Sequence, residues 1–434
     1  MSGIVYKLND VFVVGSQPTI TYNPRPSLGL DDKVREYLDE CGRILCITGP
    51  TKSGKTVLIR KVVHNCVRIS GGEIETIDDF WSDLIDGLDA YTVETYEENV
   101  GHEFSSATEA TGSIKPGGIG AEVAGQKGSS ESSSQRHTQT RQRSTRSVAK
   151  AELLRSKAPV VVDDFHHIPV NVQRQIVHGV KDLVFDRVPF VFVSVPHHSA
   201  DVVRAEKEMK GRVEQLVVTT WTEDELGEIG TKGFAALNIA MPEEMSARMA
   251  KESYGSPHLM QDFCLQICKT NNLKESLPEP ALMGGEAHDG FFRKIAEGDE
   301  LDATYTRLAQ GPRPRADRIP RRMKNGETKD IYGALLLAIA ETGPKAELDW
   351  VDIRGALRRI MTDEPPKQQE CTRVLEQMSS IAKKLVWDDN DKRFVGDPVL
   401  DFDPELGKVH VTDPFFAFQL RWRIRGNGSS AVRR

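Results

Sequence analysis

The sequence predicts an α/β fold: a parallel sheet with helices on both faces, followed by a helical lid and a smaller C-terminal α+β domain. Short apolar runs alternate along the chain with helical patterns, and they span residues 43–48, 159–162, 188–195 and 213–219. This alternation is typical of parallel strands joined by crossover helices. Nearer the C-terminus, three amphipathic patterns at 329–341, 351–361 and 368–385 precede short strand patterns. Three helices and a hairpin are the parts of a winged helix.

Composition limits the class of protein. The chain has 434 residues and a formal charge of -7, from 57 Lys and Arg against 64 Asp and Glu. At about 150 residues per domain the length suggests two or three domains, and the mild acidity excludes a protein basic over its whole surface. No segment approaches the roughly 20 apolar residues of a membrane span, and the first residues do not resemble a signal peptide. We therefore expect a cytoplasmic protein without membrane contact.

The chain divides into six regions by pattern and composition. We predict an N-terminal extension with a hairpin (1–30), an α/β core (31–220), a helical lid (221–275), a basic linker (276–325), the winged-helix domain (326–425) and a tail (426–434). The core contains a Ser- and Arg-rich insertion at about 96–147 that is too poor in large apolar side chains to order itself. Its basic half leaves two interpretations open: a solvated linker, or an arm that meets nucleic acid or a neighbouring subunit.

A glycine-rich octapeptide at residues 49–56 is the most specific motif. It has the form G-x-x-x-x-G-K-[ST] and lies directly between a predicted strand and a predicted helix, as a phosphate-binding P-loop requires. Backbone N–H groups and the helix N-terminus would surround the phosphates of ATP, Lys55 would offset their charge, and the Thr56 hydroxyl would bind Mg²⁺. The predicted nucleotide-binding residues of this segment are Gly49, Pro50, Thr51, Lys52, Ser53, Gly54, Lys55, Thr56 and Val57.

Four further positions are candidates for metal binding and the chemistry of hydrolysis. Asp163 ends an apolar run and is the predicted carboxylate for Mg²⁺, and Asp164 is then placed to orient or deprotonate the attacking water. Ser194 ends the next apolar run, where it would lie beside the γ-phosphate. Arg212 precedes the last strand and could reach the γ-phosphate in a neighbouring subunit, with Arg204 as a substitute.

Each of these residues also has a purely structural interpretation. Asp164 could cap the next helix, Ser194 could be a turn residue, and Arg212 could pair with Glu208 on the surface. The histidine doublets at 166–167 and 197–198 follow neighbouring strands, and without matching Cys or carboxylate spacing we favour polar rim residues over a metal cluster. The six cysteines are too few for a disulfide framework in a chain of this length, so buried thiols are expected.

With these motifs, residues 25–270 resemble the AAA+/STAND superfamily of P-loop ATPases. The YGSP turn at 254–257 resembles the family's Gly-x-Pro element, which implies that Pro257 touches the nucleotide, and NPR at 23–25 is faintly similar to its N-terminal arginine motif. The VTDPFFAF segment at 411–418 is similar to one in prokaryotic archaeal-type ATPases with a C-terminal winged helix. The insertion has no counterpart in the common core, so no role is transferred to it.

Three functions remain open at this stage. The resemblance implies a Mg²⁺-dependent ATPase acting as a switch or assembly factor, a homo-oligomer or bound to a partner protein, in phage defence or stress signalling. The alternative is a nucleic-acid-binding ATPase related to initiator or transposition-regulator ATPases, with the basic insertion, the basic linker or the winged helix on phosphates. The third is a regulatory nucleotide-binding module that does not hydrolyse ATP.

Overall fold

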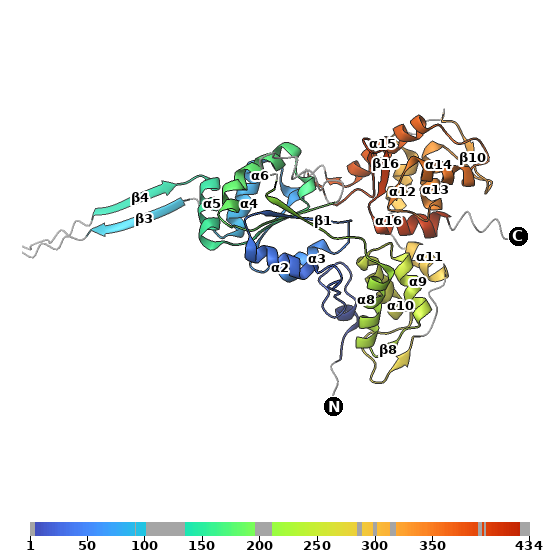
Figure 1. Ribbon diagram of the computed structural model, residues 1–434, viewed down its shortest axis with the longest axis horizontal. Coiled ribbons are helices and arrows are strands. Elements are labelled where there is room, and N and C mark those ends of the chain that lie inside the picture. Colours follow the sequence, from blue (N-terminus) through green and yellow to red (C-terminus); the bar gives the residue numbers. More distant parts are fainter. Residues whose placement is uncertain are drawn as a thin grey trace, which may run out of the picture.

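A computed structural model describes residues 5–91, 93–100, 135–195, 211–283, 289–297, 302–312, 318–388, 393–394 and 396–425. Figure 1 shows a sheet-containing core, a helical lid and a C-terminal domain, with a long two-stranded arm projecting from the core on the side away from the other two parts. In the described part of the chain, no helix has both the length and the apolar composition needed to cross a membrane.

The core is built on one parallel sheet. Its strands are β1 (Ile44–Thr48), β2 (Val67–Ser70), β5 (Val160–Asp163), β6 (Phe190–Ser194) and β7 (Val213–Val217), in the order β2-β5-β6-β1-β7. Each neighbouring pair is parallel. The carboxyl ends of all five strands therefore lie at the same edge of the sheet. This arrangement confirms the predicted α/β fold class.

Helices cover both faces of this sheet because alternate strand residues point to opposite sides. On one face, α2 (Leu30–Glu40) and α3 (Lys55–Val62) pack on Leu45, Ile47 and Val191. On the other, α4 (Ile77–Gly87), α5 (Thr145–Ser156) and α6 (Val170–Phe185) pack on Cys46 and Phe192. Figure 1 shows the two layers on opposite sides of β1. The core is thus a three-layer sandwich.

The predicted N-terminal hairpin is wrong. Among residues 5–30, the structure has a short helix, α1 (Leu8–Val11), and irregular turns. Leu8, Val11 and Phe12 are buried in the apolar cluster of the lid, where the Phe12 and Phe234 ring centroids lie 4.9 Å apart. Close packing explains why Gly233 faces this ring, since a Cβ there would lie 2.2 Å from Phe12. The N-terminal segment therefore packs against the lid.

The insertion is more regular at its ends than its composition predicts. β3 (Val93–Val100) and β4 (Gln135–Gln142) form the antiparallel arm seen in Figure 1. Their register places Glu94 opposite Arg141 and Glu98 opposite His137. Residues 101–134 of the predicted insertion lie outside the described residues.

The lid contains three helices, α8 (Glu223–Ala236), α9 (Glu243–Glu252) and α10 (Pro257–Thr270), and a two-stranded pairing of β8 (Ile239–Ala240) with β9 (Ala281–Leu282). The predicted basic linker is wrong in its first half. There the described residues form α11 (Asp289–Glu297) and α12 (Asp302–Gln310). Phe291 and Phe292 bury α11 against Phe263 of the lid. The amphipathic spacing of α11 favours a helix packed on the lid over an extended linker.

The C-terminal domain has its own apolar core. It contains α13 (Ile331–Glu341), α14 (Trp350–Ile360) and α15 (Gln368–Leu385) beside an antiparallel sheet of β12 (Glu347–Leu348), β16 (Lys408–Val411) and β15 (Leu400–Asp403). Smaller pairs join β10 (Arg321–Arg322) to β11 (Thr328–Lys329) and β13 (Trp387–Asp388) to β14 (Arg393–Phe394). The described chain ends with α16 (Pro414–Gln419) and a π-helical turn, Leu420–Arg425.

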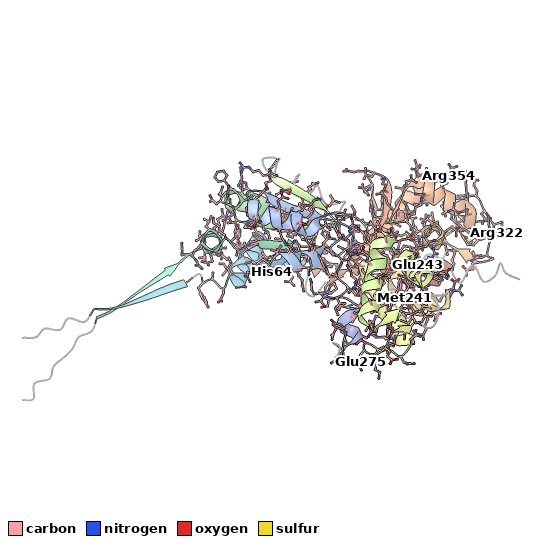
Figure 2. All side chains as sticks on the ribbon, turned by 60° about the horizontal axis from the view of Figure 1, so that its bottom comes forward. His64, Met241, Glu243, Glu275, Arg322 and Arg354 are labelled. Atoms are coloured by element: carbon pink, nitrogen blue, oxygen red, sulfur yellow. The ribbon has the colours of Figure 1, made fainter. Side chains whose placement is uncertain are left out.

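The C-terminal domain packs on the lid through its last helix. Phe418 and Trp422 are buried in the lid's apolar cluster, and the Trp422 ring stacks on Phe292 at 5.1 Å. The Trp422 indole N–H donates to Glu252, whose other oxygen pairs with Arg421 at 2.9 Å. Arg322 and Arg354 lie at the far side of the domain, away from the core (Figure 2). The docked face is therefore the one that carries α16.

Candidate functional site

The predicted phosphate loop joins β1 to α3 at the carboxyl edge of the sheet. Its first glycine has no room for a side chain, because a Cβ on Gly49 would lie 2.5 Å from the Val218 carbonyl oxygen. Gly54 adopts φ +93°, which favours glycine because a Cβ would clash with the backbone. The Trp221 indole N–H donates to the Ser53 carbonyl at 2.8 Å and holds the loop from the lid side. Both glycines of the motif are thus required by the loop geometry.

Lys55 lies inside the loop. Its side chain is buried, and the ammonium donates to the carbonyl oxygens of Gly49 and Pro50 at 2.8 Å each. Burial lowers the pKa of Lys55, while the negative charges of Asp397, Asp164 and Asp163 oppose this effect. A buried cation at the mouth of a glycine-rich loop fits a phosphate anion, which would replace the loop carbonyls as its partner.

Thr56 and Asp163 meet across the edge of the sheet. The Thr56 hydroxyl donates to the Asp163 carboxylate at 2.9 Å, although the two residues are 107 positions apart in the sequence. A hydroxyl and a carboxylate oxygen are ligands that suit Mg²⁺, which usually binds one or two protein groups together with nucleotide phosphates. These two residues fit the ion that the sequence predicts.

Asp164 lies beside this pair and faces the same cavity. It has a left-handed backbone, φ 51°, and precedes a short 3₁₀ helix, Phe165–His167. Burial raises the pKa of Asp164, and the charges of Asp163 and Asp397 raise it further. Raised carboxyl pKa values are a property of general bases and of buried carboxyl clusters alike. Asp164 is thus a carboxyl group of raised pKa in the wall of the cavity.

A cavity of about 630 Å³ extends from the phosphate loop towards the lid. The loop, Asp163 and Asp164 line this cavity together with Trp221, Pro257 and Arg25. Pro257 begins α10 and lines the cavity; its contact with a nucleotide, which the family resemblance implies, stays a prediction. The volume is within the range of about 300–1,000 Å³ typical of small-molecule sites.

Arg25 connects the N-terminal segment to the lid beside this cavity. Its guanidinium pairs with Glu225 at 2.9 Å, donates to the Thr219 and Thr220 carbonyls, and stacks over Trp221 at 4.9 Å. Burial disfavours the charged form of Glu225, but hydrogen bonds from Arg25 and from the Thr222 backbone outweigh this effect and lower its pKa. Arg25 therefore ties the N-terminal segment to α8 and to residues 219–220 beside the cavity.

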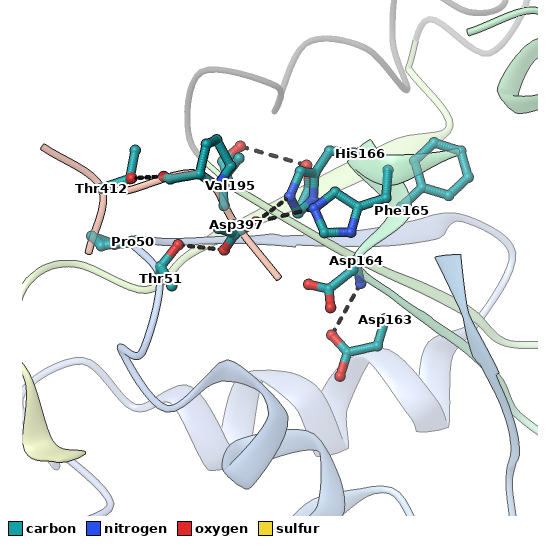
Figure 3. A network of polar contacts seen from close by, with 12 residues as sticks. Pro50, Thr51, Asp163, Asp164, Phe165, His166, Val195, Asp397 and Thr412 are labelled. Carbon is teal, nitrogen blue, oxygen red and sulfur yellow. Dashed lines mark hydrogen bonds and ion pairs between the residues drawn. The ribbon is translucent and has the colours of Figure 1, made fainter. Parts of the chain in front are cut away.

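Two carboxylates of the C-terminal domain contact the phosphate loop directly. Asp413 pairs with Lys52 at 2.7 Å and also caps α16 by accepting from the Phe415 and Phe416 backbone N–H groups. Asp397 accepts hydrogen bonds from the Thr51 hydroxyl and from His166 (Figure 3). Both carboxylates line the cavity. Sequence reasoning missed them as site residues, although Asp413 lies in a motif that it noted.

Ser194 and Arg212 lie at different ends of their strands. Ser194 pairs in register with Thr48 at the edge that carries the phosphate loop, but it is buried and its hydroxyl faces the Val195 carbonyl at 3.5 Å. Arg212 precedes β7, and its carbonyl accepts from Ile44 at the opposite edge. Arg212 thus lies away from the cavity of its own chain. Arg204, Glu208, His197 and His198 lie outside the described residues.

The six cysteines are all described and form no disulfide; Cys46, Cys264, Cys268 and Cys371 are buried, as expected.

The histidine doublet at 166–167 is not a polar rim exposed to solvent. Both imidazoles contact Asp397, at 2.8 Å from His166 and 3.2 Å from His167. The signal available in the sequence was the doublet directly after the two aspartates. Its carboxylate partner is about 230 residues away and could not be paired with it by spacing.

Comparison with known proteins gives similar structures but no family. No protein-family model matches the chain, and no significant match exists among curated proteins. A Cdc6 protein of Pyrobaculum aerophilum is 12% identical, with a TM-score of 0.41 over 96% of this chain and 98% of that one. The ORC2 protein of Aeropyrum pernix, solved as ADPNP–ADP complexes, is 11% identical, with a TM-score of 0.47 over 98% and 99%. A Walker-type ATPase of Pyrococcus abyssi is 12% identical, with a TM-score of 0.47 over 92% and 95%.

Proposed function

We propose that this protein is an AAA+-type ATPase that binds and hydrolyses ATP with Mg²⁺ and uses the state of its nucleotide to control the docking of its C-terminal winged-helix domain. The observation that carries the proposal is the contact of Asp397 and Asp413 with Thr51 and Lys52. Two adjacent residues of the phosphate loop are held by carboxylates of another domain. Binding or release of a nucleotide at the loop would therefore alter the electrostatic surroundings of both contacts.

The roles of the core residues follow from their positions. Lys55 would bind the β- and γ-phosphates, and Thr56 and Asp163 would hold Mg²⁺, which offsets phosphate charge when bound. Asp164 would orient the attacking water and accept its proton. Ser194, at the strand end between the two motifs, would contact that water or the γ-phosphate after a side-chain rotation. Pro257 would place the lid on the nucleotide.

Charge explains how the nucleotide would act on the docked domain. The carboxylates of Asp397 and Asp164 already face the same cavity, and each adds to the cost of a further negative charge there. A γ-phosphate bound in this cavity would bring such charge near Asp397 and would compete for the cations Lys52 and Lys55. ATP should therefore weaken the docking of the C-terminal domain more than ADP does.

Hydrogen exchange of the full-length protein tests this proposal. We expect saturating Mg·ATP to raise amide exchange in the segments around Asp397 and in α16 relative to Mg·ADP, and Lys55→Ala to remove the difference. The exchange of α14, which lies in the same domain without a contact to the loop, serves as the internal control. Unchanged exchange at Asp397 and α16 with nucleotide demonstrably bound would refute the switch while leaving nucleotide binding intact.

A further inference from the structure

Three side chains of the kinds that bind transition metals converge between the core and the C-terminal domain. His166 and His167 belong to the 3₁₀ helix after β5, and Asp397 belongs to the loop before β15. One carboxylate oxygen of Asp397 lies 2.8 Å from Nε2 of His166 and 3.2 Å from Nε2 of His167 (Figure 3). All three side chains are shielded, with exposed fractions of 6%, 7% and 14%.

The spacing of these atoms suits a small divalent ion. The possible ligand atoms of the three residues all lie within 4.8 Å of one another. Zinc–nitrogen and zinc–oxygen bonds of about 2.0–2.2 Å in a tetrahedron separate neighbouring ligand atoms by roughly 3.4 Å. The 2.8 Å and 3.2 Å separations from Asp397 are shorter than this by about 0.6 Å and 0.2 Å, so small side-chain movements would admit an ion.

The electrostatic surroundings also favour a cation. Asp163, Asp164 and Asp397 lie near one another, and all three interact electrostatically with Lys55. These carboxylates line or adjoin a shielded place, which favours the binding of a positive ion.

We propose that His166, His167 and Asp397 form a binding site for a divalent transition-metal ion of the Zn²⁺ type, which ties the C-terminal domain to the core. Two imidazole nitrogens and one carboxylate select such an ion over Mg²⁺, which prefers an all-oxygen shell. This site is therefore distinct from the Mg²⁺ site proposed at Thr56 and Asp163. A fourth tetrahedral position remains for water.

Thr51 acts as a positioning residue in this proposal. Its hydroxyl donates to the second carboxylate oxygen of Asp397 and so fixes the orientation of the ligand. Hydrogen bonds to metal ligands typically change metal affinity by about 10- to 100-fold. Because Thr51 also belongs to the phosphate loop, the proposed metal site and the proposed nucleotide site share one hydrogen bond.

Zinc titration of the full-length protein, stripped with a chelator and kept free of nucleotide and Mg²⁺, tests the inference. We expect one Zn²⁺ per chain in competition with a chromogenic chelator, a rise in the thermal midpoint on binding, and with Co²⁺ the visible absorption of a four-coordinate site. Because no nucleotide is present, failure of this experiment is separate from failure of the proposed ATPase function.

Glutamine variants distinguish a metal site from a hydrogen-bonded clamp. His166→Gln and His167→Gln keep an N–H donor towards Asp397 but remove a good metal ligand, so each should lower Zn²⁺ affinity by roughly 100-fold or more, beyond the effect of an outer hydrogen bond. His64→Gln is the matched control, since His64 is exposed and lies outside the cluster (Figure 2). Wild-type protein without a stoichiometric site, or a His166→Gln/His167→Gln double variant that binds Zn²⁺ as wild type does, would overturn the proposal.

Discussion

Individual side chains in the cavity have separable tasks because they occupy different positions around it. Thr56 and Asp163 are within hydrogen-bond distance, whereas Asp164 faces the cavity beside them. Neutralising one residue should therefore not reproduce the effect of another. Lys55 and Asp163 would act in binding, and Asp164 would act in the chemical step. The two aspartates differ by one position, so the same substitution at each gives a matched pair.

Asp164→Asn should bind ATP with nearly wild-type affinity but hydrolyse it about 100- to 10,000-fold more slowly, the usual contribution of a general base. Asp163→Asn should instead weaken the dependence of ATP binding on Mg²⁺. Steady-state phosphate release and fluorescence titration with a labelled nucleotide measure the two effects. If Asp164→Asn retained the wild-type turnover rate, the assignment of Asp164 would be wrong.

The sequence predicted the site residues that follow a local rule. The loop of residues 49–56 and Asp163 follow strands directly, so a motif and the common edge of parallel strands were enough to place them together. Asp397 and Asp413 depend on how two domains pack, which no periodicity records. The N-terminal alternation was too short to separate a hairpin from α1, and the polar composition of residues 276–325 did not reveal the short amphipathic α11.

The junction of the N-terminal segment with α8 should be sensitive to pH. Because the pKa of Glu225 is lowered below its ordinary value of 4.5, the carboxylate stabilises the fold above that pH, and this contribution is lost as the pH falls through the lowered pKa. Glu225→Gln should lack this part of the acid dependence. Urea unfolding from pH 7 to pH 3 measures it, with Glu228→Gln as the exposed control on the same helix. Parallel stability curves for wild type and Glu225→Gln would contradict the prediction.

At the scale of the whole molecule, the cavity lies where the core, the lid and the C-terminal domain meet. The lid contributes Pro257, the C-terminal domain contributes Asp397 and Asp413, and the last helix packs on the lid through Phe418 and Trp422. Arg212 does not take part, because it lies at the opposite edge of the sheet. If Arg212 acts in hydrolysis, it must do so in a neighbouring copy of the chain.

Mixing two inactive variants tests that arrangement. Arg212→Ala retains Asp164, and Asp164→Ala retains Arg212, so a mixed oligomer would contain some complete sites. We expect the mixture to recover part of the ATPase activity that each variant lacks alone. Wild-type activity in Arg212→Ala would remove its catalytic role, and absence of recovery in mixtures shown to co-assemble would argue against action between subunits.

Equilibrium binding of ATP by the full-length protein in the presence of Mg²⁺ tests the central claim most directly. We predict one nucleotide per chain in calorimetric titration and an affinity at least about tenfold lower in Lys55→Ala, since a lost hydrogen bond to a charged group costs about 1.5–3 kcal/mol. Lys33→Ala, on the exposed face of α2, should bind as wild type does. A wild-type protein with no measurable affinity for ATP, or one whose affinity is the same without the Lys55 side chain, would contradict the account.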